Sequence, residues 1–483
     1  MHEILTPAQM YQADALAVKA GGSSLRLMEK AGRAVADEIT RRFKKCRVAV
    51  ICGPGNNGGD GFVVARVLAG KKWPVNLFIT GEAAALHGDA AKMFRKWKGR
   101  VRPFAALGTS FELRSKPQLI VDAIFGAGLN REMNPTWVDA IAAAHVPVVA
   151  VDVPSGLDGA TGRSMGACVK ADLTVTFFRK KPAHVLLPGR GFCGDVVVAD
   201  IGITPPVLDD IKPMLWENVA PMLPTIASNT HKYQRGHAVV WSGPEFATGA
   251  ARLAALAAAR SGAGVVSIAG PAAALRIHAA HVSSVMLREI TSDTEFTALL
   301  DDKRITALCI GPGAGVSSVL RRKVLTALGA GVACVLDADA LTSFEGHAQE
   351  LVDAVKGDLK RPVILTPHEG EFVRLFNELK DPVESKVERV RRAAALLGAT
   401  VLLKGADTVI ASPNGRAKIN ANAPAKLATA GSGDVLAGII TGLLAQGMDG
   451  FEAACGGVWL HGNAGNTVNR RNLIAEDLIE ALG

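Results

Sequence analysis

The chain has 483 residues, too many for one ordinary hydrophobic core, and we expect two or three domains. Hydrophobic residues make up 49% and aromatic residues only 5%, which favours closely packed helices on parallel sheets. The net charge of +9 comes from scattered basic residues, so it indicates a solvated surface rather than a nucleic-acid or membrane partner. No apolar run could cross a bilayer and residues 1–10 lack the pattern of an export signal, so we expect a cytoplasmic protein.

The first part of the chain alternates short Val/Ile-rich runs with helical stretches. This alternation predicts βαβ units and a parallel sheet. The expected strands are 48–52, 75–80, 119–122, 146–152, 173–178 and 196–199. Prolines then accumulate between Thr204 and Arg235 and the periodicity fades, which predicts a linker with a domain boundary near residue 215.

A second alternating series fills the rest of the chain. Its expected strands are 238–242, 265–269, 307–311, 333–337, 363–366, 401–404 and 408–411. The Ala-rich segment 250–260 predicts a helix packed closely on a sheet, and 423–447 predicts a glycine loop running into an apolar helix. We therefore expect an α/β protein of two three-layer αβα domains, residues 1–215 and residues 225–483, the first Rossmann-like.

A glycine-rich segment follows the first expected strand. Residues 53–61 contain five glycines before the helical run 62–68, which predicts either a close approach of a ligand to the backbone or a very tight turn. The Asn and Asp side chains of this loop provide oxygens suited to a hard cation, a ribose or an amide. Two further expected strand ends, at 122–131 and 151–159, would open on the same edge of the sheet.

The most specific motif of the chain is the decapeptide 429–438, with the sequence TAGSGDVLAG. Gly431 and Gly433 allow a tight turn whose N–H groups face an anion at the start of a helix, an arrangement that stabilises a phosphoryl group in transfer. Asp434 at the helix start could accept the proton of an attacking hydroxyl. The alternative is that Asp434 only caps the helix.

Three other strand ends carry candidate residues, each with an alternative. Lys404 could reach a nucleotide phosphate or could be a surface lysine. His368 could contact substrate or could be a satisfied loop histidine. Asp337 and Asp339 could orient a magnesium ion or support the sheet edge.

The decapeptide resembles the anion-hole motif of the ribokinase-like family. The segments 336–341, 365–372 and 403–408 are similar to those of one branch, the ADP/ATP-dependent NAD(P)H-hydrate dehydratases, and the resemblance covers most of 225–483. It implies ADP or ATP with magnesium, nucleotide contacts around 404–408 and along 422–433, and substrate contacts. The implied nucleotide residues are Lys404, Gly405, Ala406, Asp407, Thr408, Thr429, Ala430, Gly431, Ser432 and Gly433, and the implied substrate residues are Gly249, Gly313, His368 and the catalytic Asp434. One departure is His231–Gly236, where the family usually has a glycine-rich His-Lys-Gly segment.

The three N-terminal loops together resemble the NAD(P)H-hydrate epimerase domain over nearly all of residues 1–215. The resemblance implies that Asp152 contacts the reacting ring, whereas the alternative is a turn carboxylate before Val-Pro. It also implies a potassium ion held by Asn57, Asp122 and Ser155. The implied substrate residues are Asn56, Asn57, Gly58, Gly59, Asp60, Gly126, Ala127, Gly128, Leu129, Asn130, Arg131, Glu132 and Asp152.

Taken together, the two resemblances imply a bifunctional enzyme of metabolite repair. Its first domain would interconvert the R and S forms of hydrated NADH and NADPH, and its second would dehydrate the S form through a phosphorylated intermediate. We expect small-molecule substrates only and a homo-oligomer. One alternative is a kinase of a vitamin-precursor alcohol with a nucleotide-binding regulatory domain. Another is that the first half is a catalytically silent binding module for protein or RNA.

Overall fold

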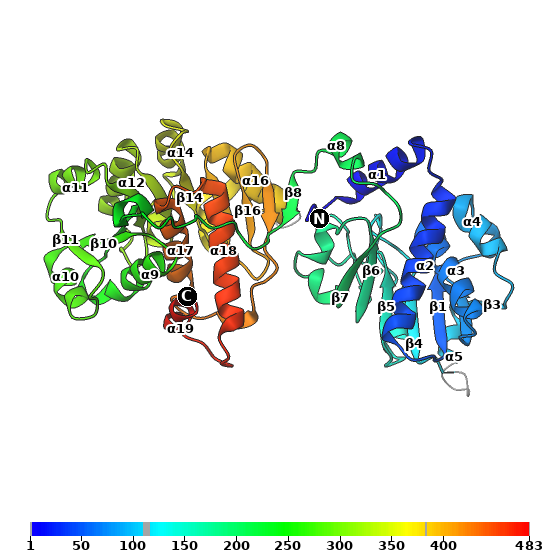
Figure 1. The fold of residues 1–483 in the computed structure, drawn as a ribbon. Coiled ribbons are helices and arrows are strands. Elements are labelled where there is room, and N and C mark those ends of the chain that lie inside the picture. Colours follow the sequence, from blue (N-terminus) through cyan, green and yellow to red (C-terminus); the bar gives the residue numbers. More distant parts are fainter. Residues whose placement is uncertain (1, 110–115, 382–383, 483) are drawn as a thin grey trace. The chain divides into compact units, whose positions relative to one another are not determined.

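The computed structural model describes residues 2–109, 116–381 and 384–482. The chain divides into two compact units, Met1–Leu215 and Trp216–Gly483, each built around its own sheet (Figure 1). Both units are α/β, as the alternation of apolar runs predicted. Within the described ranges, no helix combines the length and the apolar character needed to cross a membrane.

The first unit contains a seven-stranded parallel sheet of order β3-β2-β1-β4-β5-β6-β7. Its strands are β1 Val48–Cys52, β2 Val75–Ile79, β3 Val101–Pro103, β4 Leu119–Ala123, β5 Val148–Val151, β6 Leu173–Phe177 and β7 Asp195–Ala199. The strand order reverses between β1 and β4, so the loops after these two strands diverge and leave a crevice between them. The sequence did not predict β3 because its three residues have no buried apolar run.

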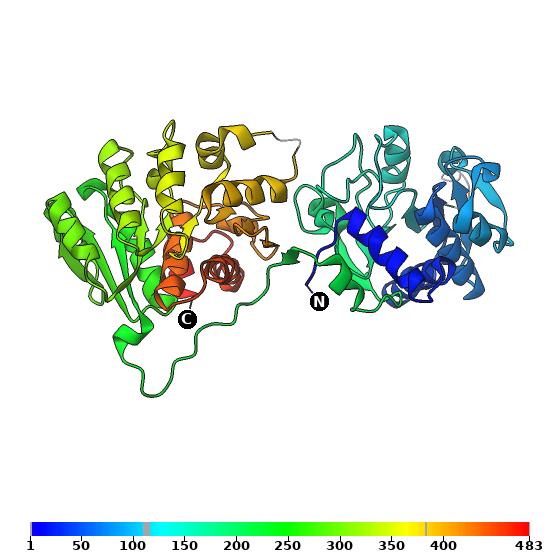
Figure 2. The same ribbon diagram turned by 90° about the horizontal axis from the view of Figure 1, so that it is seen from above.

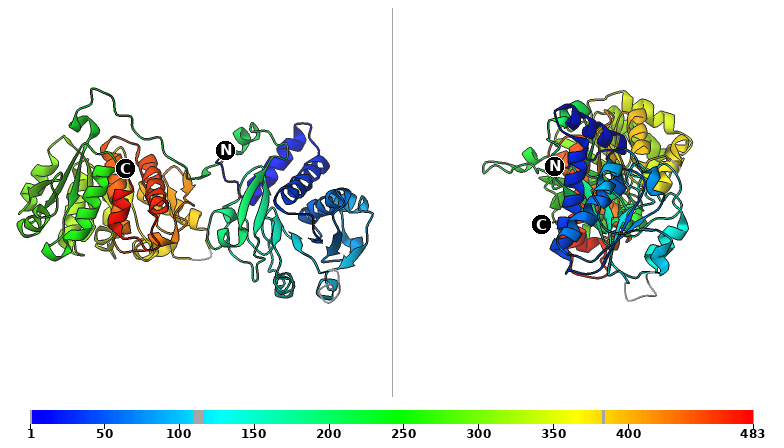
Figure 3. Two further views of the ribbon diagram at one scale, coloured as in Figure 1. Left: turned by 60° about the horizontal axis from the view of Figure 1, so that its bottom comes forward. Right: turned by 90° about the vertical axis from the view of Figure 1, so that its right-hand side faces the viewer.

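Helices cover both faces of this sheet (Figure 3). They are α1 Pro7–Lys19, α2 Ser24–Arg42, α3 Asn56–Gly70, α4 Gly88–Arg95, α5 Ala106–Thr109, α6 Pro135–Ala142, α7 Arg190–Cys193 and α8 Val207–Ile211. Alternate residues of β1 enter opposite cores: Val48 and Val50 pack with α2 and α3, whereas Ala49 and Ile51 pack with α6. Both faces are therefore buried, which explains the continuous apolar runs in the sequence.

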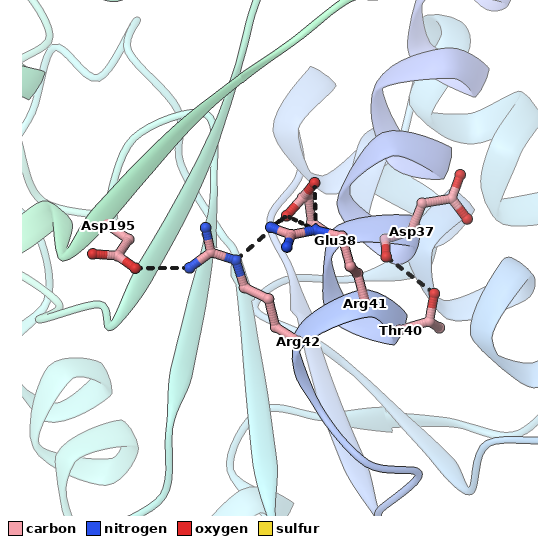
Figure 4. Close-up of polar contacts among 6 residues, drawn as sticks. All are labelled: Asp37, Glu38, Thr40, Arg41, Arg42 and Asp195. Atoms are coloured by element: carbon pink, nitrogen blue, oxygen red, sulfur yellow. Dashed lines mark hydrogen bonds and ion pairs between the residues drawn. The ribbon is translucent and has the colours of Figure 1, made fainter.

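Basic residues at the end of α2 form ion pairs with acidic residues at the surface (Figure 4). Arg42 bridges Glu38 on its own helix, at 3.4 Å, and Asp195 on β7, at 2.7 Å. Arg41 pairs with the same Glu38 at 2.7 Å. These charges therefore pair with acids at the surface, in agreement with the predicted solvated face, and such exposed pairs stabilise little.

The second unit contains a ten-stranded sheet of order β11-β10-β9-β12-β13-β14-β15-β16-β17-β8. The strands are β8 Leu215–Glu217, β9 His237–Trp241, β10 Val265–Gly270, β11 Met286–Glu289, β12 Ile305–Ile310, β13 Ala333–Leu336, β14 Val363–Leu365, β15 Thr400–Leu403, β16 Val409–Ala411 and β17 Ala417–Ile419. Pairing is parallel from β11 to β15 and antiparallel from β15 to β17. The order reverses between β9 and β12, which gives this unit a crevice of its own.

The helices of the second unit include the two small-residue helices expected from the sequence. They are α9 Thr248–Arg260, α10 Ala272–Ala279, α11 Asp293–Leu300, α12 Ser318–Gly329, α13 Asp339–Thr342, α14 Ala348–Lys356, α15 Glu369–Leu375, α16 Lys386–Leu397, α17 Ser432–Ala445, α18 Gly450–Thr467 and α19 Ala475–Glu480. α9 and α17 approach closely because a Cβ on Gly438 would lie 2.7 Å from the Cα of Ala254. Residues 218–231, which follow β8, contain no helix or strand (Figure 2).

Candidate active sites

The candidate site of the first unit lies where β1, β4 and β5 end. A cavity of about 750 Å³ opens there, and residues from the three glycine- and acid-containing segments line it. Of the residues implied by the resemblance, the structure places Asn56, Asn57, Asp60, Gly126, Ala127, Gly128, Leu129, Asn130, Arg131 and Asp152 on the cavity wall. Gly58 and Gly59 are buried in α3, and Glu132 is exposed outside the cavity wall.

The expected glycine loop is shorter than the sequence suggested. α3 begins at Asn56, so the prediction of a loop up to Gly61 is wrong. A Cβ on Gly59 would lie 2.6 Å from Met28 Sδ, and a Cβ on Gly61 would lie 2.7 Å from Cys52 Sγ. These glycines therefore let α3 pack directly on its neighbours rather than form a turn, and α3 begins at the cavity.

Asp152 occupies a strained position directly after β5. Its backbone has φ of +66°, which is uncommon for a residue with a side chain. Its Oδ1 accepts from Lys181 Nζ at 2.7 Å and from Thr176 Oγ1 at 2.9 Å, and its Oδ2 accepts from the Ala127 N–H at 3.1 Å. Burial raises the pKa of Asp152, but the Lys181 ammonium and these hydrogen bonds outweigh burial and hold the pKa below its usual value.

Two further carboxyl groups face the same cavity. Burial and the nearby charge of Asp152 raise the pKa of Asp60 well above its usual value. Burial likewise raises the pKa of Asp14 to about 6, while the Lys181 ammonium lowers it in part. The cavity therefore combines the ionised carboxylate of Asp152 with two carboxyl groups, Asp60 and Asp14, that bind protons more readily.

Two of the three residues implied to hold potassium, Asp122 and Ser155, are joined by hydrogen bonds. Ser155 donates through Oγ to Asp122 Oδ1 at 2.6 Å and through its N–H to Oδ2 at 2.8 Å. Burial raises the pKa of Asp122 to about 6, against these hydrogen bonds, and the carboxylate has no basic partner in the described ranges. Asn57 Oδ1 lies beside Gly126, in the segment after β4, 3.1 Å from the position of a Cβ there. A carboxylate, a hydroxyl and an amide oxygen are donors whose chemistry suits a monovalent cation.

The candidate site of the second unit centres on the start of α17. Gly431 precedes the helix with φ of +83°, in the left-handed region that glycine adopts readily. The N–H groups of Gly433 and Asp434 have no acceptor among the described residues. Free N–H groups at the positive end of a helix can bind an anion, so this geometry suits the anion site that stays a prediction from the motif.

A lysine and two acids converge on this helix start from neighbouring strands. Lys404 Nζ, after β15, lies 2.7 Å from Asp337 Oδ1, after β13, and 3.8 Å from Glu371 Oε2. A Cβ on Gly433 would lie 3.6 Å from the same Nζ. Burial first, then the charge of Asp337, raises the pKa of Asp434 to about 6, although Lys404 lowers it in part. The site thus presents a cation, free N–H groups and a carboxyl of near-neutral pKa.

The segment 404–408 folds into a turn held by its own side chains. Thr408 Oγ1 accepts the Gly405 N–H at 3.1 Å and donates to the Gly405 carbonyl at 2.7 Å. Asp407 is buried and accepts from Lys386 Nζ at 2.7 Å, whereas Gly405 and Ala406 are exposed. In the second nucleotide segment Thr429 is half-buried, Ala430 is exposed, and the buried Ser432 Oγ lies 3.0 Å from His461 Nε2.

The implied substrate residues of this unit lie at the ends of different strands. Gly313, after β12, has φ of +61°, and a Cβ there would lie 2.7 Å from the Ala247 carbonyl, beside the first turn of α9 that contains Gly249. His368 Nδ1 accepts the N–H groups of Gly370 and Glu371 at 3.0 and 3.2 Å and so caps α15. The capping role agrees with the alternative that His368 is a loop histidine whose hydrogen bonds are satisfied within the protein. Substrate contact by the half-exposed ring stays a prediction.

Several residues at the site of the first unit were not predicted. Thr176 lies near the end of β6 and Lys181 follows this strand, yet both were missed. Their polar side chains near a strand end were the signal that could have identified them. Tyr11 and Asp14 were missed because they belong to α1, far from any strand end. Within the described ranges no group of three or more His, Cys, Asp or Glu side chains is arranged to hold a metal ion. Asp339 Oδ2 accepts the Gly315 N–H at 2.8 Å and so supports a loop.

Both units match known families. Residues 238–482 match the family described as NAD(P)H-hydrate dehydratase, and residues 24–183 match the family described as YjeF-related protein N-terminus. Among solved structures, the ADP/ATP-dependent NAD(P)H-hydrate dehydratase of Bacillus subtilis, crystallised with ATP and Mg²⁺, is 30% identical. That match covers 54% of this chain and 92% of the Bacillus chain, with a TM-score of 0.46.

Whole-length relatives join both families in one chain. The chain is 36% identical to the bifunctional NAD(P)H-hydrate repair enzyme Nnr of Moorella thermoacetica, covering 99% of this chain and 96% of the relative. It is 34% identical to the enzyme of the same name from Salinibacter ruber, covering 99% and 95%. The chain belongs to the family of bifunctional NAD(P)H-hydrate repair enzymes. This finding confirms the resemblance drawn from the motifs.

Proposed function

We propose that this protein repairs NADH and NADPH whose nicotinamide ring has added water. The first unit would interconvert the R and S hydrates, and the second would dehydrate the S hydrate with ADP or ATP. Hydroxide is a poor leaving group, whereas phosphate leaves readily. Transfer of a phosphoryl group to the ring hydroxyl would let the ring nitrogen push electrons out as phosphate departs, which regenerates the reduced cofactor.

The observation that carries the proposal for the second unit is the position of Asp434 at a helix start whose N–H groups have no acceptor among the described residues. Free N–H groups at Gly433 and Asp434 would stabilise the charge of a phosphoryl group in transfer. Asp434, with a pKa of about 6, is ionised at neutral pH and basic enough to accept the proton of the ring hydroxyl. An acceptor beside an anion site is what hydroxyl phosphorylation requires.

The nucleotide would lie along the turn 404–408 and the loop 429–433. Gly405 and Ala406 offer exposed backbone there, and Lys404 offers a cation. Magnesium usually binds through one or two carboxylates together with substrate phosphates, so a pre-formed cluster of three acids is not needed. Asp337 is the carboxylate we assign to such an ion, which would neutralise phosphate charge, because its Oδ2 has no partner among the described side chains.

In the first unit we assign ring chemistry to Asp152 and a potassium ion to Asn57, Asp122 and Ser155. Inversion of the hydroxyl carbon needs loss of water from one face of the ring and return of water to the other. Asp152 stays ionised through its contact with Lys181, so it is suited to accept a proton from the returning water. A cation beside Asp122 would offset the burial of its charge and fix the wall of the cavity.

The test is a reaction of the full chain with separated R and S hydrates, with and without ADP or ATP. We expect inorganic phosphate and reduced nicotinamide, detected by its absorbance, to form together from the S hydrate. A stable phosphorylated product would instead identify a small-molecule kinase. Exchange of the two epimers without nucleotide is expected, and its absence would leave the first unit a binding module.

A further inference from the structure

Helix α1 contributes two polar side chains to the wall of the cavity in the first unit. Tyr11 and Asp14 are three residues apart, so they lie on one face of the helix, and both line the cavity with Asp152 and Lys181. A Cβ on Gly128, in the segment after β4, would collide with the Tyr11 hydroxyl. This helix therefore faces the same space as the strand-end residues.

Asp14 differs from Asp152 in its partners. Asp152 accepts three hydrogen bonds, one of them from the Lys181 ammonium. Lys181 is only 1% exposed and divides its donors between Asp152, Thr176 and the Phe177 carbonyl. Across the described residues, no hydrogen bond or ion pair engages the Asp14 carboxyl group. Asp14 is thus a half-buried carboxyl that faces the cavity and has no donor to keep it ionised.

The two carboxyl groups are therefore suited to opposite roles. Burial raises the pKa of Asp14 to about 6, whereas Lys181 holds the pKa of Asp152 below its usual value. Two acids whose environments separate their protonation states are the usual arrangement of an acid and a base in one site. Near neutral pH a fraction of Asp14 carries a proton that it can donate.

Asp60 is the competing candidate for the acid. It also lines the cavity, but it is only 9% exposed and lies in the first turns of α3. Burial raises its pKa well above the usual value, which makes it a weaker donor than Asp14. Asp14 is half-buried, so water can return its proton between turnovers. These differences favour Asp14.

We propose that Asp14 is a catalytic residue of the first unit, the general acid that protonates the hydroxyl leaving the hydrated ring. This inference rests on the proposed epimerase function. The C–O bond breaks, the ring nitrogen lone pair forms a C=N bond, and the hydroxyl leaves as water with the Asp14 proton. Water then adds to the opposite face of the same carbon and gives a proton to Asp152. Cavity water returns that proton to Asp14, so protons and electrons balance over the cycle.

The test compares Asp14→Asn with Asp37→Asn in the full chain. Asp37 makes an exposed pair with Lys71, so the same chemical change there leaves the cavity intact. We expect Asp14→Asn to lower kcat for epimer exchange about 100-fold or more with little change in KM, and the control to match wild type. Dehydration of pure S hydrate by the same preparations reports folding. An unchanged kcat, or a loss confined to KM, would overturn the assignment.

A pH series separates this inference from the proposed function. Wild-type exchange, corrected for the uncatalysed rate, should fall as pH rises through about 6, because Asp14 loses its proton. The other charged groups lining the cavity are Asp60, Asp89, Arg131, Asp152 and Lys181, and the exposed Asp209 and Asp210 lie on α8, which packs on α1. Asp14→Glu should keep the fall and Asp14→Asn should lose it.

The outcomes are distinguishable. If wild type exchanges no epimers at any pH, the proposed epimerase function fails before Asp14 is tested. If wild type exchanges them and Asp14→Asn keeps the same fall with pH, another group is the acid. If Asp14→Asn does not fold, Asp14→Glu decides: a folded variant with the alkaline fall supports Asp14, and one without it refutes Asp14.

Discussion

Asp152 in the first unit and Asp434 in the second are both carboxylates near a lysine, yet their protonation differs. Lys181 donates directly to Asp152 at 2.7 Å and holds its pKa below the usual value. Lys404 instead donates to Asp337 at 2.7 Å, so Asp434 keeps no direct cation and burial raises its pKa to about 6. The comparison shows that a lysine holds down the pKa of a neighbouring acid when it donates a hydrogen bond to that acid directly, and that proximity alone does not offset burial.

Removing the carboxylate of one unit at a time is expected to have the largest effect, and it tests whether the two sites act independently. We expect Asp434→Ala to lower dehydration by about 10²- to 10⁴-fold, because the proton acceptor is lost, and to spare epimer exchange. Asp152→Ala should do the reverse. Both activities are measured on each full-length variant with separated epimers. Loss of both activities from either substitution would contradict two independent sites.

The two units should also respond oppositely to pH. Dehydration at saturating nucleotide should rise about tenfold per pH unit below about 6 and level off above it, because Asp434 must be ionised to accept a proton. Epimer exchange should instead fall through the same range if Asp14 is its acid. Rates of both reactions from pH 4.5 to 8.5, roughly spanning these values, provide the check. Parallel profiles would show that one shared group, or the substrate itself, titrates.

The sequence predicted the sheets and the strand-end loops but not all of the side chains around them. The alternation of apolar runs was sufficient for β1 and β4 because both of their faces are buried. The start of α3 at Asn56 was missed since glycines that serve close helix packing look like turn glycines in sequence. Asp14 was missed for another reason: no local pattern shows that a helix far from the strand ends will face their crevice.

A pair of glycines in the second unit separates backbone strain from site geometry. Gly431 and Gly447 both have φ of +83°, but a Cβ on Gly431 would lie 2.8 Å from Leu253 Cδ1, whereas nothing lies within 4 Å at Gly447. Gly447→Ala should cost about 1 to 2 kcal/mol of unfolding free energy, from the left-handed backbone alone. Gly431→Ala should cost about 1 to 3 kcal/mol more, from crowding, and should reduce dehydration but not epimer exchange. Equal losses of stability and unchanged dehydration would show that Gly431 does not shape the anion site.

The smallest expected effect concerns ion pairs on the surface of the first unit. It tests whether side chains outside the cavity influence the activity of this unit. Arg42→Ala removes ion pairs to Glu38 and Asp195, both between partly exposed side chains. It should lower the unfolding free energy of this unit by about 0.2 to 1 kcal/mol. The difference between wild type and variant should shrink in high salt, because screening weakens these ion pairs in the wild type. Arg95→Ala is the matched control, since Arg95 is exposed and has no ion pair with a described residue. Thermal unfolding of both variants at low and high salt measures the difference, and neither activity should change, because these side chains lie outside the residues that line the cavity. A change in epimer exchange with Arg42→Ala would mean that the end of α2 influences the cavity through the helix itself.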